Sequence, residues 1–162
     1  MLIGLISDTH DHVPNIKKAV AEFKKRKVDL VLHAGDYCSP FTIPEFEGLN
    51  LKGIFGNNDG DKYLLISKFN EIGAEIAGDF LKVKAGGLLI ALYHGTYAEI
   101  TDSLCHSGRY DIVVSGHIHE QVNRVIDETM HINPGTAHGF GEEASIAFLD
   151  TETKEVEFVT LN

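Results

Sequence analysis

Seven side chains of the kinds that can bind divalent metals follow five short apolar segments of the sequence. The set is Asp8, His10, Asp36, Asn57, His94, His117 and His119. Imidazole with carboxylate and amide oxygen, and without thiolate, suits Mn²⁺, Fe²⁺, Co²⁺, Ni²⁺ or Zn²⁺. Seven ligands exceed what one tetrahedral ion takes and fit two ions that share a bridging carboxylate. Such a pair can clamp the attacking and leaving oxygens of a phosphoryl displacement, so the residues predict a phosphoesterase.

Each piece also has a structural explanation when it is taken alone. Asp8 and Asp36 can serve as helix caps, residues 57–60 have the composition of a plain turn, and His94 can be a core histidine. The pair His117 and His119 is harder to explain by structure alone, because neighbouring histidines on one face repel when charged. Five independent coincidences at five successive strand ends are a poor explanation, so we favour one shared metal site.

The first 36 residues have the pattern of a βαβ unit, which would position the first ligands. A buried strand is expected at 2–6, an amphipathic helix at 14–27 and a second buried strand at 28–33. Such a unit makes parallel strands with a right-handed crossover. Ligands then bind beyond the carboxyl ends of the strands, where Asp8 and Asp36 stand.

The remaining chain alternates helices and strands and then becomes rich in strands. Helical segments are expected at 41–47, 61–72 and 96–107, and strands at 51–55, 74–77, 80–84, 88–93, 111–115, 121–126, 129–133, 145–150 and 156–160. Hairpin turns are expected at 78–79, 86–87 and 127–128, and a helix C-cap at Gly108. This order predicts an α/β protein of two packed sheets flanked by helices, in one domain over residues 1–162.

Charge and composition narrow the class of partner. The 162 residues include 24 acidic and 14 basic ones, for a net charge of −10. A protein that wraps duplex nucleic acid needs a broad positive face, whereas the basic cluster at 24–27 lies at a helix end and offsets the helix dipole. Two cysteines, no signal peptide and no apolar run of ~18 residues predict a cytoplasmic protein without a membrane partner. A homodimer suits so small an enzyme.

The five ligand segments together resemble a known family. They read Asp8-Thr9-His10, Gly35-Asp36, Gly56-Asn57-Asn58-Asp59, His94-Gly95 and Gly116-His117-Ile118-His119. Their order and spacing resemble the calcineurin-like metallophosphoesterase superfamily. The short chain and the segment 132–136 are similar to its small YfcE-type phosphodiesterase branch. The resemblance implies a four-layer α/β/β/α sandwich of two mixed β-sheets flanked by helices.

The same resemblance implies roles for individual residues. The first metal is bound by Asp8, His10, Asp36 and His119, and the second by Asp36, Asn57, His94 and His117. Asp36 is then the bridge, and a hydroxide between the ions attacks phosphorus in line. Residues expected to take part in catalysis are Asp36, Asn57, Asn58 and Asp59. The cofactor expected is a pair of divalent ions, manganese first, with nickel, zinc, iron or cobalt as alternatives, acting on a small phosphate ester.

One position departs from the family pattern. Many relatives carry a histidine where this chain has Asn58, and an amide cannot act as a general acid at neutral pH. We therefore expect weak catalysis on esters with poor leaving groups, unless one of the remaining histidines substitutes (His12, His33, His131 or His138), to none of which we assign a role. The alternatives to a phosphodiesterase are a non-enzymatic interaction scaffold on the same fold, a metal-dependent nuclease and a metal-dependent amide hydrolase.

Overall fold

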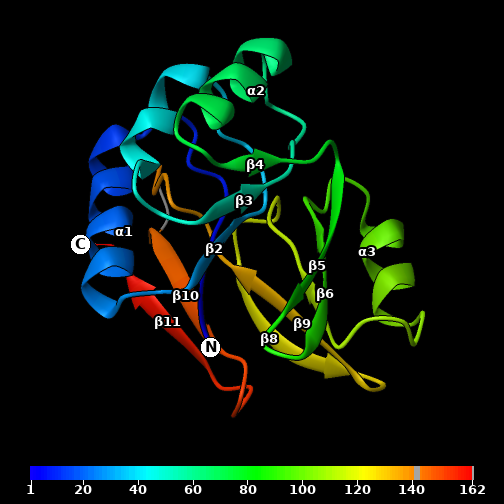
Figure 1. The fold of residues 1–162 in the computed structure, drawn as a ribbon. Helices are drawn as coiled ribbons and strands as arrows, with labels where there is room; N and C mark the ends of the chain where they lie inside the picture. Colours follow the sequence, from blue (N-terminus) through cyan, green and yellow to red (C-terminus); the bar gives the residue numbers. More distant parts are fainter. Residues whose placement is uncertain (141–142, 162) are drawn as a thin grey trace.

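Two β-sheets stacked face to face form the centre of the molecule, with helices on both outer sides (Figure 1). The structure is a computed structural model that describes residues 1–140 and 143–161. Among the helices in these ranges, none has the length and apolar character needed to cross a membrane. The layers run helix, sheet, sheet, helix, which confirms the predicted four-layer sandwich.

The first sheet has six strands in the order β11-β10-β1-β2-β3-β4. Their bounds are β1 Leu2–Ile6, β2 Leu30–His33, β3 Leu51–Gly53, β4 Glu75–Ile76, β10 Ser145–Asp150 and β11 Val156–Thr160. The strands β1, β2, β3 and β4 are parallel, while β10 and β11 add antiparallel pairs. The predicted βαβ unit is confirmed, and the carboxyl ends of β1, β2 and β3 lie along one edge.

The second sheet has five strands in the order β5-β6-β7-β9-β8. Their bounds are β5 Phe80–Ala85, β6 Leu88–Tyr93, β7 Ile112–Val114, β8 Gln121–Ile126 and β9 Thr129–Pro134. Strand β7 is parallel to both neighbours, and β5 and β8 close the edges as hairpins. The β5–β6 turn has Gly86 at φ +55 and Gly87 at φ +82. Two positive φ values in a two-residue turn match the twist of the strands, so this predicted hairpin is confirmed.

The helices cover the outer faces of the sheets. Their bounds are α1 Val13–Arg26, a 3₁₀ segment Pro40–Phe46, α2 Lys62–Glu71 and α3 Ala98–Cys105. The first three lie on the six-stranded sheet and α3 lies on the five-stranded sheet (Figure 1). Helix α1 begins after His12, whose Nδ1 accepts a hydrogen bond from the backbone of Asn15. Asp8 therefore does not cap this helix, which removes one structural explanation for its position.

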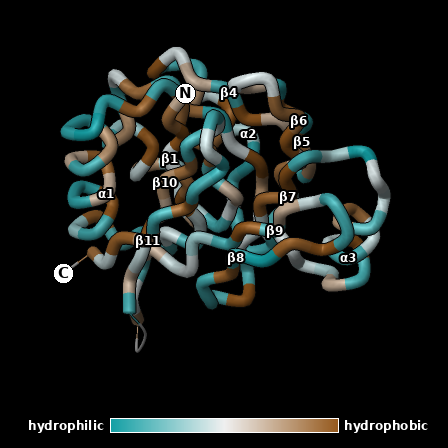
Figure 2. Tube along the Cα trace, turned by 90° about the horizontal axis from the view of Figure 1, so that it is seen from below, coloured by the Kyte–Doolittle hydropathy of each residue, from teal (hydrophilic) through white to brown (hydrophobic). Residues whose placement is uncertain are grey.

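Alternation along the central strands divides the core into two layers. On β1, Ile3 and Leu5 face the second sheet and meet Ile90 and Leu92, whereas Ile6 faces the helices. Helix α1 accordingly has hydrophobic residues on the side toward the sheet and hydrophilic residues on its outer side (Figure 2). Both faces of the six-stranded sheet are therefore buried, one against the helices and the other against the second sheet. This packing places the strand ends of the two sheets side by side.

Two local predictions are wrong. The turn at 78–79 is not a hairpin, because β4 ends one sheet and β5 begins the other, and the Gly78 carbonyl accepts from the Phe55 N–H at 2.7 Å. The glycine signals a chain reversal, but it does not determine which sheet the next strand joins. Gly108 is not the C-cap of α3 either. His106 caps that helix, and Gly108 takes its positive φ of +63 two residues later.

Candidate metal centre

The predicted ligands meet where the strand ends of the two sheets face each other. On one side, Oδ1 of Asp8 lies 3.7 Å from Nε2 of His10 and 3.3 Å from Nε2 of His119. Nε2 of His10 also lies 3.5 Å from Oδ2 of Asp36. Ligands of one ion bound at ~2.1 Å lie roughly 3 to 3.5 Å from one another. The ligand atoms of Asp8, His10 and Asp36 all lie within 4.8 Å of one another, close enough to share one ion, and His119 adjoins this group through Oδ1 of Asp8.

A second group meets on the other side of Asp36. Nε2 of His94 lies 3.4 Å from Oδ2 of Asp36 and 3.0 Å from Oδ1 of Asn57. The ring of His117 lies 5.2 Å, centroid to centroid, from that of His94. The same Asp36 oxygen thus faces Nε2 of both His10 and His94, and His117 joins the second group by its ring contact with His94.

Strained backbone turns these side chains inward. Five of the seven predicted ligands have left-handed φ values, from +38 to +69, namely Asp8, His10, Asp36, His117 and His119. A non-glycine residue in this region costs of order 1 kcal/mol or more and persists where its surroundings hold it. Strain of this kind gathers at functional sites, because a sharp bend just after a strand aims the side chain across the strand ends.

Two glycines of the motifs make room for the carboxylates. A Cβ on Gly56 would stand 2.1 Å from Oδ1 of Asp36, and a Cβ on Gly116 would stand 2.6 Å from Oδ2 of Asp8. Either contact is too short to exist without moving the carboxylate. The glycines that precede Asn57 and His117 are thus required by close packing at this site.

Hydrogen bonds fix the orientation of the ligands. His94 donates from Nδ1 to the carbonyl oxygen of Ala34 at 2.7 Å, so its Nε2 points at Asp36. Asn58 donates to Asp36 twice, from the backbone N–H and from Nδ2, both at 2.8 Å. Sγ of Cys38 lies 3.2 Å from Nδ1 of His10. Hydrogen bonds within the protein thus orient the His94 ring and the Asp36 carboxylate without the help of an ion.

Electrostatics keep the carboxylates ionised although they are buried. Burial opposes ionisation of Asp8, but contacts with His10 and His119 lower its pKa well below the usual value. Burial likewise opposes ionisation of Asp36, but His94 lowers the pKa of Asp36. Burial opposes the charged form of His94, and Asp36 nevertheless raises the pKa of His94. Two buried carboxylates at this depth require positive charge nearby.

Two buried atoms of the site identify where that charge belongs. Oδ1 of Asp8 and Nε2 of His10 have no hydrogen-bond partner among the described residues. Buried polar atoms are rarely left this way in native proteins. Both atoms are good ligands for a divalent cation, and the thiol beside them stays protonated because burial raises the pKa of Cys38 to about 12. The residues present therefore fit a hard or borderline divalent metal.

Asp59 stands apart from the ligand groups. Its Oδ2 accepts from the backbone N–H groups of Gly56 and Asp36 at 2.7 and 3.1 Å, and its Oδ1 accepts from that of Cys38 at 2.9 Å. These bonds tie the loop after β3 to the loop after β2. Such an arrangement favours a positioning role for Asp59 over the direct catalytic role predicted from the sequence.

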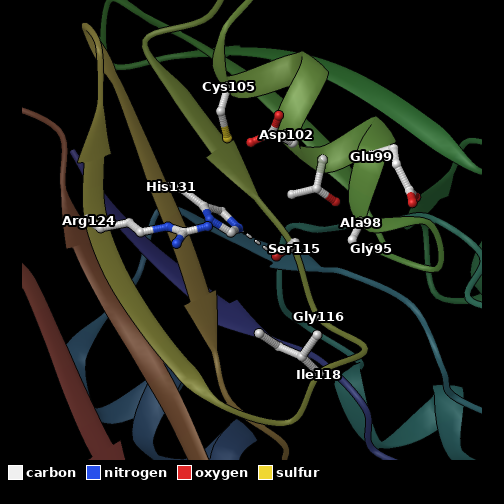
Figure 3. Close-up of a pocket in the computed structure, with 11 residues that line it drawn as sticks. Gly95, Ala98, Glu99, Asp102, Cys105, Ser115, Gly116, Ile118, Arg124 and His131 are labelled. Atoms are coloured by element: carbon white, nitrogen blue, oxygen red, sulfur yellow. Dashed lines mark hydrogen bonds between the residues drawn. The ribbon is translucent and has the colours of Figure 1, made fainter.

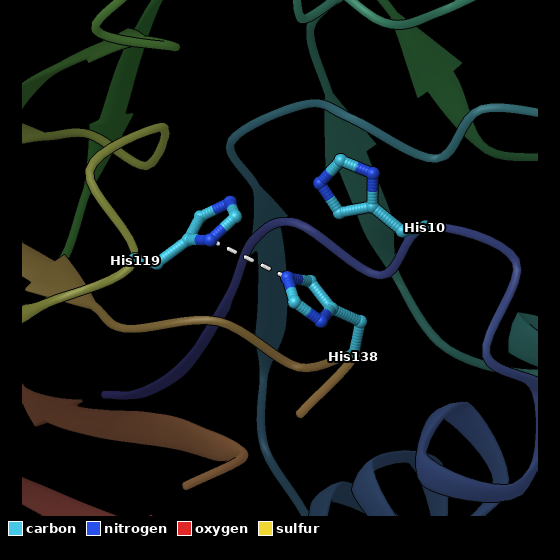
Figure 4. A group of neighbouring side chains, drawn as sticks. All are labelled: His10, His119 and His138. Atoms are coloured by element: carbon cyan, nitrogen blue, oxygen red, sulfur yellow. Dashed lines mark hydrogen bonds between the residues drawn. The ribbon is translucent and has the colours of Figure 1, made fainter. Parts of the chain in front are cut away.

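Spacing alone did not distinguish the four remaining histidines, and the structure separates them. His12 caps α1, and His33 and His131 are buried and hydrogen-bonded within the protein. His138 lies beside the site, its ring 4.8 Å from that of His10 and 4.7 Å from that of His119 (Figure 4). Nitrogens of these three rings lie within 4.8 Å of one another, close enough to share an ion. No motif spacing marks His138, because it stands four residues beyond β9.

Packed mixed sheets with a carboxylate and imidazole cluster at their strand ends define a metal-dependent hydrolase. The calcineurin-like phosphoesterase superfamily domain matches residues 1–154. A phosphodiesterase of Methanocaldococcus jannaschii is 41% identical over 165 aligned residues, which cover 99% of each chain. The chain belongs to the calcineurin-like phosphoesterase superfamily, and the predicted resemblance is confirmed.

Solved structures agree with this assignment. The structure of a novel archaeal phosphodiesterase superposes with a TM-score of 0.95 at 40% identity, covering 99% of this chain and 100% of its own. YfcE, a phosphoesterase from E. coli, superposes with a TM-score of 0.71 at 18% identity, with both chains covered completely. The second comparison shows the shared fold. The predictions of a phosphoesterase and of its fold class are both confirmed.

Proposed function

We propose that this protein is a phosphodiesterase that hydrolyses a small phosphate ester with two divalent metal ions. One ion would be held by Asp8, His10, Asp36 and His119, and the other by Asp36, Asn57, His94 and His117. The observation that carries the proposal is the position of Asp36. Its Oδ2 lies 3.5 Å from Nε2 of His10 and 3.4 Å from Nε2 of His94, between the two ligand groups.

The ions, when bound, would supply Lewis acidity to the phosphoryl oxygens and to the attacking water. The protein's own residues prepare this chemistry. Asn58 orients the Asp36 carboxylate with two donors, and the carbonyl of Ala34 holds the His94 ring. Because these partners are already in place, little reorganisation is needed at the moment of reaction.

A cavity beside the second ligand group supports a small substrate. It has a volume of about 390 Å³, and Asn57 and His94 form part of its wall. Lys62 and Tyr97 also line it, and Nζ of Lys62 lies 3.4 Å from Oδ1 of Asp79 on the same wall, so the two charges offset each other. Such a wall cannot follow the phosphate backbone of a duplex, so we propose a compact ester in place of a nucleic acid.

Three further properties belong to the same proposal. Manganese is the proposed physiological metal, with nickel, zinc, iron or cobalt as alternatives, because the ligand set suits all of them. Residues 1–162 would act as one domain. A homodimer is the proposed assembly, and light scattering of the purified chain measures it directly.

The deciding experiment measures metal content and hydrolysis together. The full chain is loaded with each metal in turn and assayed on bis(p-nitrophenyl) phosphate, an oligonucleotide and an aryl amide. We expect hydrolysis of the phosphodiester alone, with bound metal and activity both lost in Asp36→Asn. Glu128→Gln changes an exposed carboxylate on the β8–β9 turn and should keep both. An inert metal-loaded protein, or Asp36→Asn protein with undiminished metal, would overturn the proposal.

A further inference from the structure

The cavity beside the second ligand group also reaches the beginning of α3. Its volume is about 390 Å³, and Asn57 and His94 form part of its wall. Another part is formed by Tyr97, the residue before α3, and by Ile100 in the first turn of that helix. An ester whose phosphate binds an ion at Asn57 and His94 would therefore place one of its organic groups next to Tyr97 and Ile100.

Tyr97 and Ile100 present accessible apolar surface to this cavity. Tyr97 is 63% exposed and Ile100 is 44% exposed, so a molecule in the cavity can contact both side chains. They stand three positions apart, which places them as neighbours at the start of the helix. Exposed apolar side chains that gather beside polar groups are typical of ligand-binding grooves. The exposed surface next to the ligands is thus suited to an apolar group.

Helix α3 presents charged side chains to a different cavity. Glu99 and Asp102 line a space of about 410 Å³ between α3 and the five-stranded sheet, where Arg124 lines the wall from β8 (Figure 3). The same helix thus directs charged residues to one cavity and apolar residues to the other. The apolar surface beside the ligands therefore belongs to one face of the helix and is not a feature of its composition as a whole.

The lysine of the cavity beside the ligands is already engaged by neighbouring groups. Nζ of Lys62 lies 3.4 Å from Oδ1 of Asp79 and 4.7 Å from the centroid of the Phe55 ring. The carboxylate offsets the charge of the lysine, and the ring contact adds a cation–π attraction. The whole chain also carries a net charge of −10. These charges disfavour a second anionic group of the substrate in this cavity.

We propose that this cavity binds an uncharged, apolar organic group of the phosphate ester, and that Tyr97 and Ile100 select it. The inference rests on the proposed function, because the phosphate of the same ester would bind the metal ions. The Tyr97 ring would supply a broad contact surface for the group, and Ile100 would cover its edge. A carboxylate or second phosphate in the same place would find the charge of Lys62 offset by Asp79.

The test is isothermal titration calorimetry of the full chain, loaded with Mn²⁺, with three phosphonates whose carbon–phosphorus bond is not hydrolysed. Phenylphosphonate carries an apolar ring, methylphosphonate a small apolar group and 3-phosphonopropionate a carboxylate. We expect phenylphosphonate to bind roughly tenfold tighter than the other two, because it buries more apolar surface. Tyr97→Ala should remove most of this preference. The variant keeps the backbone N–H of Tyr97, which donates to the hydroxyl of Tyr93 at 3.2 Å.

The matched control is Tyr63→Ala. Tyr63 on α2 is 90% exposed and lies outside the described walls of the cavity. This variant loses the same side chain from the surface and should keep the full preference for phenylphosphonate.

Four results would overturn the proposal. They are binding of none of the phosphonates, equal binding of all three, tightest binding of 3-phosphonopropionate, or a preference that Tyr97→Ala leaves unchanged. Hydrolysis of bis(p-nitrophenyl) phosphate by the same samples separates this inference from the proposed function. An active protein without the preference contradicts the apolar cavity alone. An inert protein that keeps the preference contradicts the hydrolytic function alone.

Discussion

Oδ2 of Asp8 accepts a hydrogen bond from the backbone N–H of His117 at 3.0 Å, across 109 positions of sequence. A carboxylate at the end of β1 thereby holds the loop that follows β7. The other oxygen of the same carboxylate faces His10 and His119. Asp8 thus joins the two sheets at the site and presents a ligand oxygen there.

Asp8→Asn should separate these two tasks. The amide oxygen can still accept from His117, but the negative charge that attracts a cation is gone. We expect a folded protein whose bound metal falls and whose kcat/KM drops by about 100-fold or more. Metal analysis and steady-state hydrolysis measure this. Asp8→Ala also loses the acceptor and should melt at a lower temperature than Asp8→Asn. Full metal content in Asp8→Asn would contradict the assignment.

Removal of metal should lower the stability of the protein. A cation that binds the folded chain alone stabilises it, by about 2.7 kcal/mol when its concentration is 100 times the Kd. Thermal unfolding with and without a chelator measures the shift in Tm. Asp36→Asn lacks the shared ligand, so its Tm should respond much less to the chelator. An equal shift in both proteins would place the bound metal elsewhere.

Asn58 should make the rate depend strongly on the leaving group. Its backbone N–H and its Nδ2 each donate to Asp36, and an amide does not protonate an alkoxide. We expect kcat to fall steeply along a series of phosphodiesters as the pKa of the leaving alcohol rises. Asn58→His supplies an imidazole and should flatten the series. A wild-type rate independent of leaving-group pKa would reveal an acid that acts in place of Asn58.

Asp59 should contribute to stability more than an ordinary helix cap does. It accepts three backbone N–H groups, whereas Asp61 accepts one, from Leu64 at the start of α2. Asp59→Ala leaves buried donors unpaired and should cost at least about 2 kcal/mol of unfolding free energy. Asp61→Ala should cost about 1 kcal/mol. Urea titrations compare the two variants, and equal costs would refute the positioning role.

His33 should make the protein less stable in acid. Burial keeps the pKa of His33 at about 3, against 6.5 for an exposed histidine, and Nδ1 of the neutral ring accepts from the Gly35 N–H. Between pH 3 and pH 6.5, His33 is protonated in the unfolded chain and neutral in the folded protein, so the unfolded chain binds one more proton. The stabilisation is therefore fully present above about pH 6.5 and is lost as the pH falls toward 3, with a slope of about 1.4 kcal/mol per pH unit.

The control for this prediction is His33→Asn, measured with a chelator present throughout. The asparagine oxygen can take the place of Nδ1 as acceptor for Gly35 and does not titrate. Urea unfolding between about pH 7 and pH 5 should show a shallower dependence in the variant, by close to one proton. Parallel curves for the two proteins would mean that His33 is protonated in the fold as readily as in water.

The elements of the fold were readable from local patterns. Apolar runs predicted β1 and β6 residue for residue, and the other helices and strands to within about two residues at each end, because periodicity reports burial and burial is what these elements share. The turn at 86–87 was also readable, since two glycines supply the two positive φ values that a tight hairpin needs. The candidate ligands followed from the same reasoning, as polar residues standing where apolar strands end.

The tertiary structure alone determined which strands pair and which side chains lie close together. The turn at 78–79 has the residues of a hairpin, yet the next strand joins the other sheet, because the partner of a strand depends on distant surfaces. His138 carries no signal in spacing, and the place of Asp59 in its motif does not show that it accepts hydrogen bonds from two loops, because the neighbours of both residues come from other parts of the chain. Local sequence determines which groups are buried and where strands end. Which groups then touch depends on how two sheets pack, and that is a property of the whole chain.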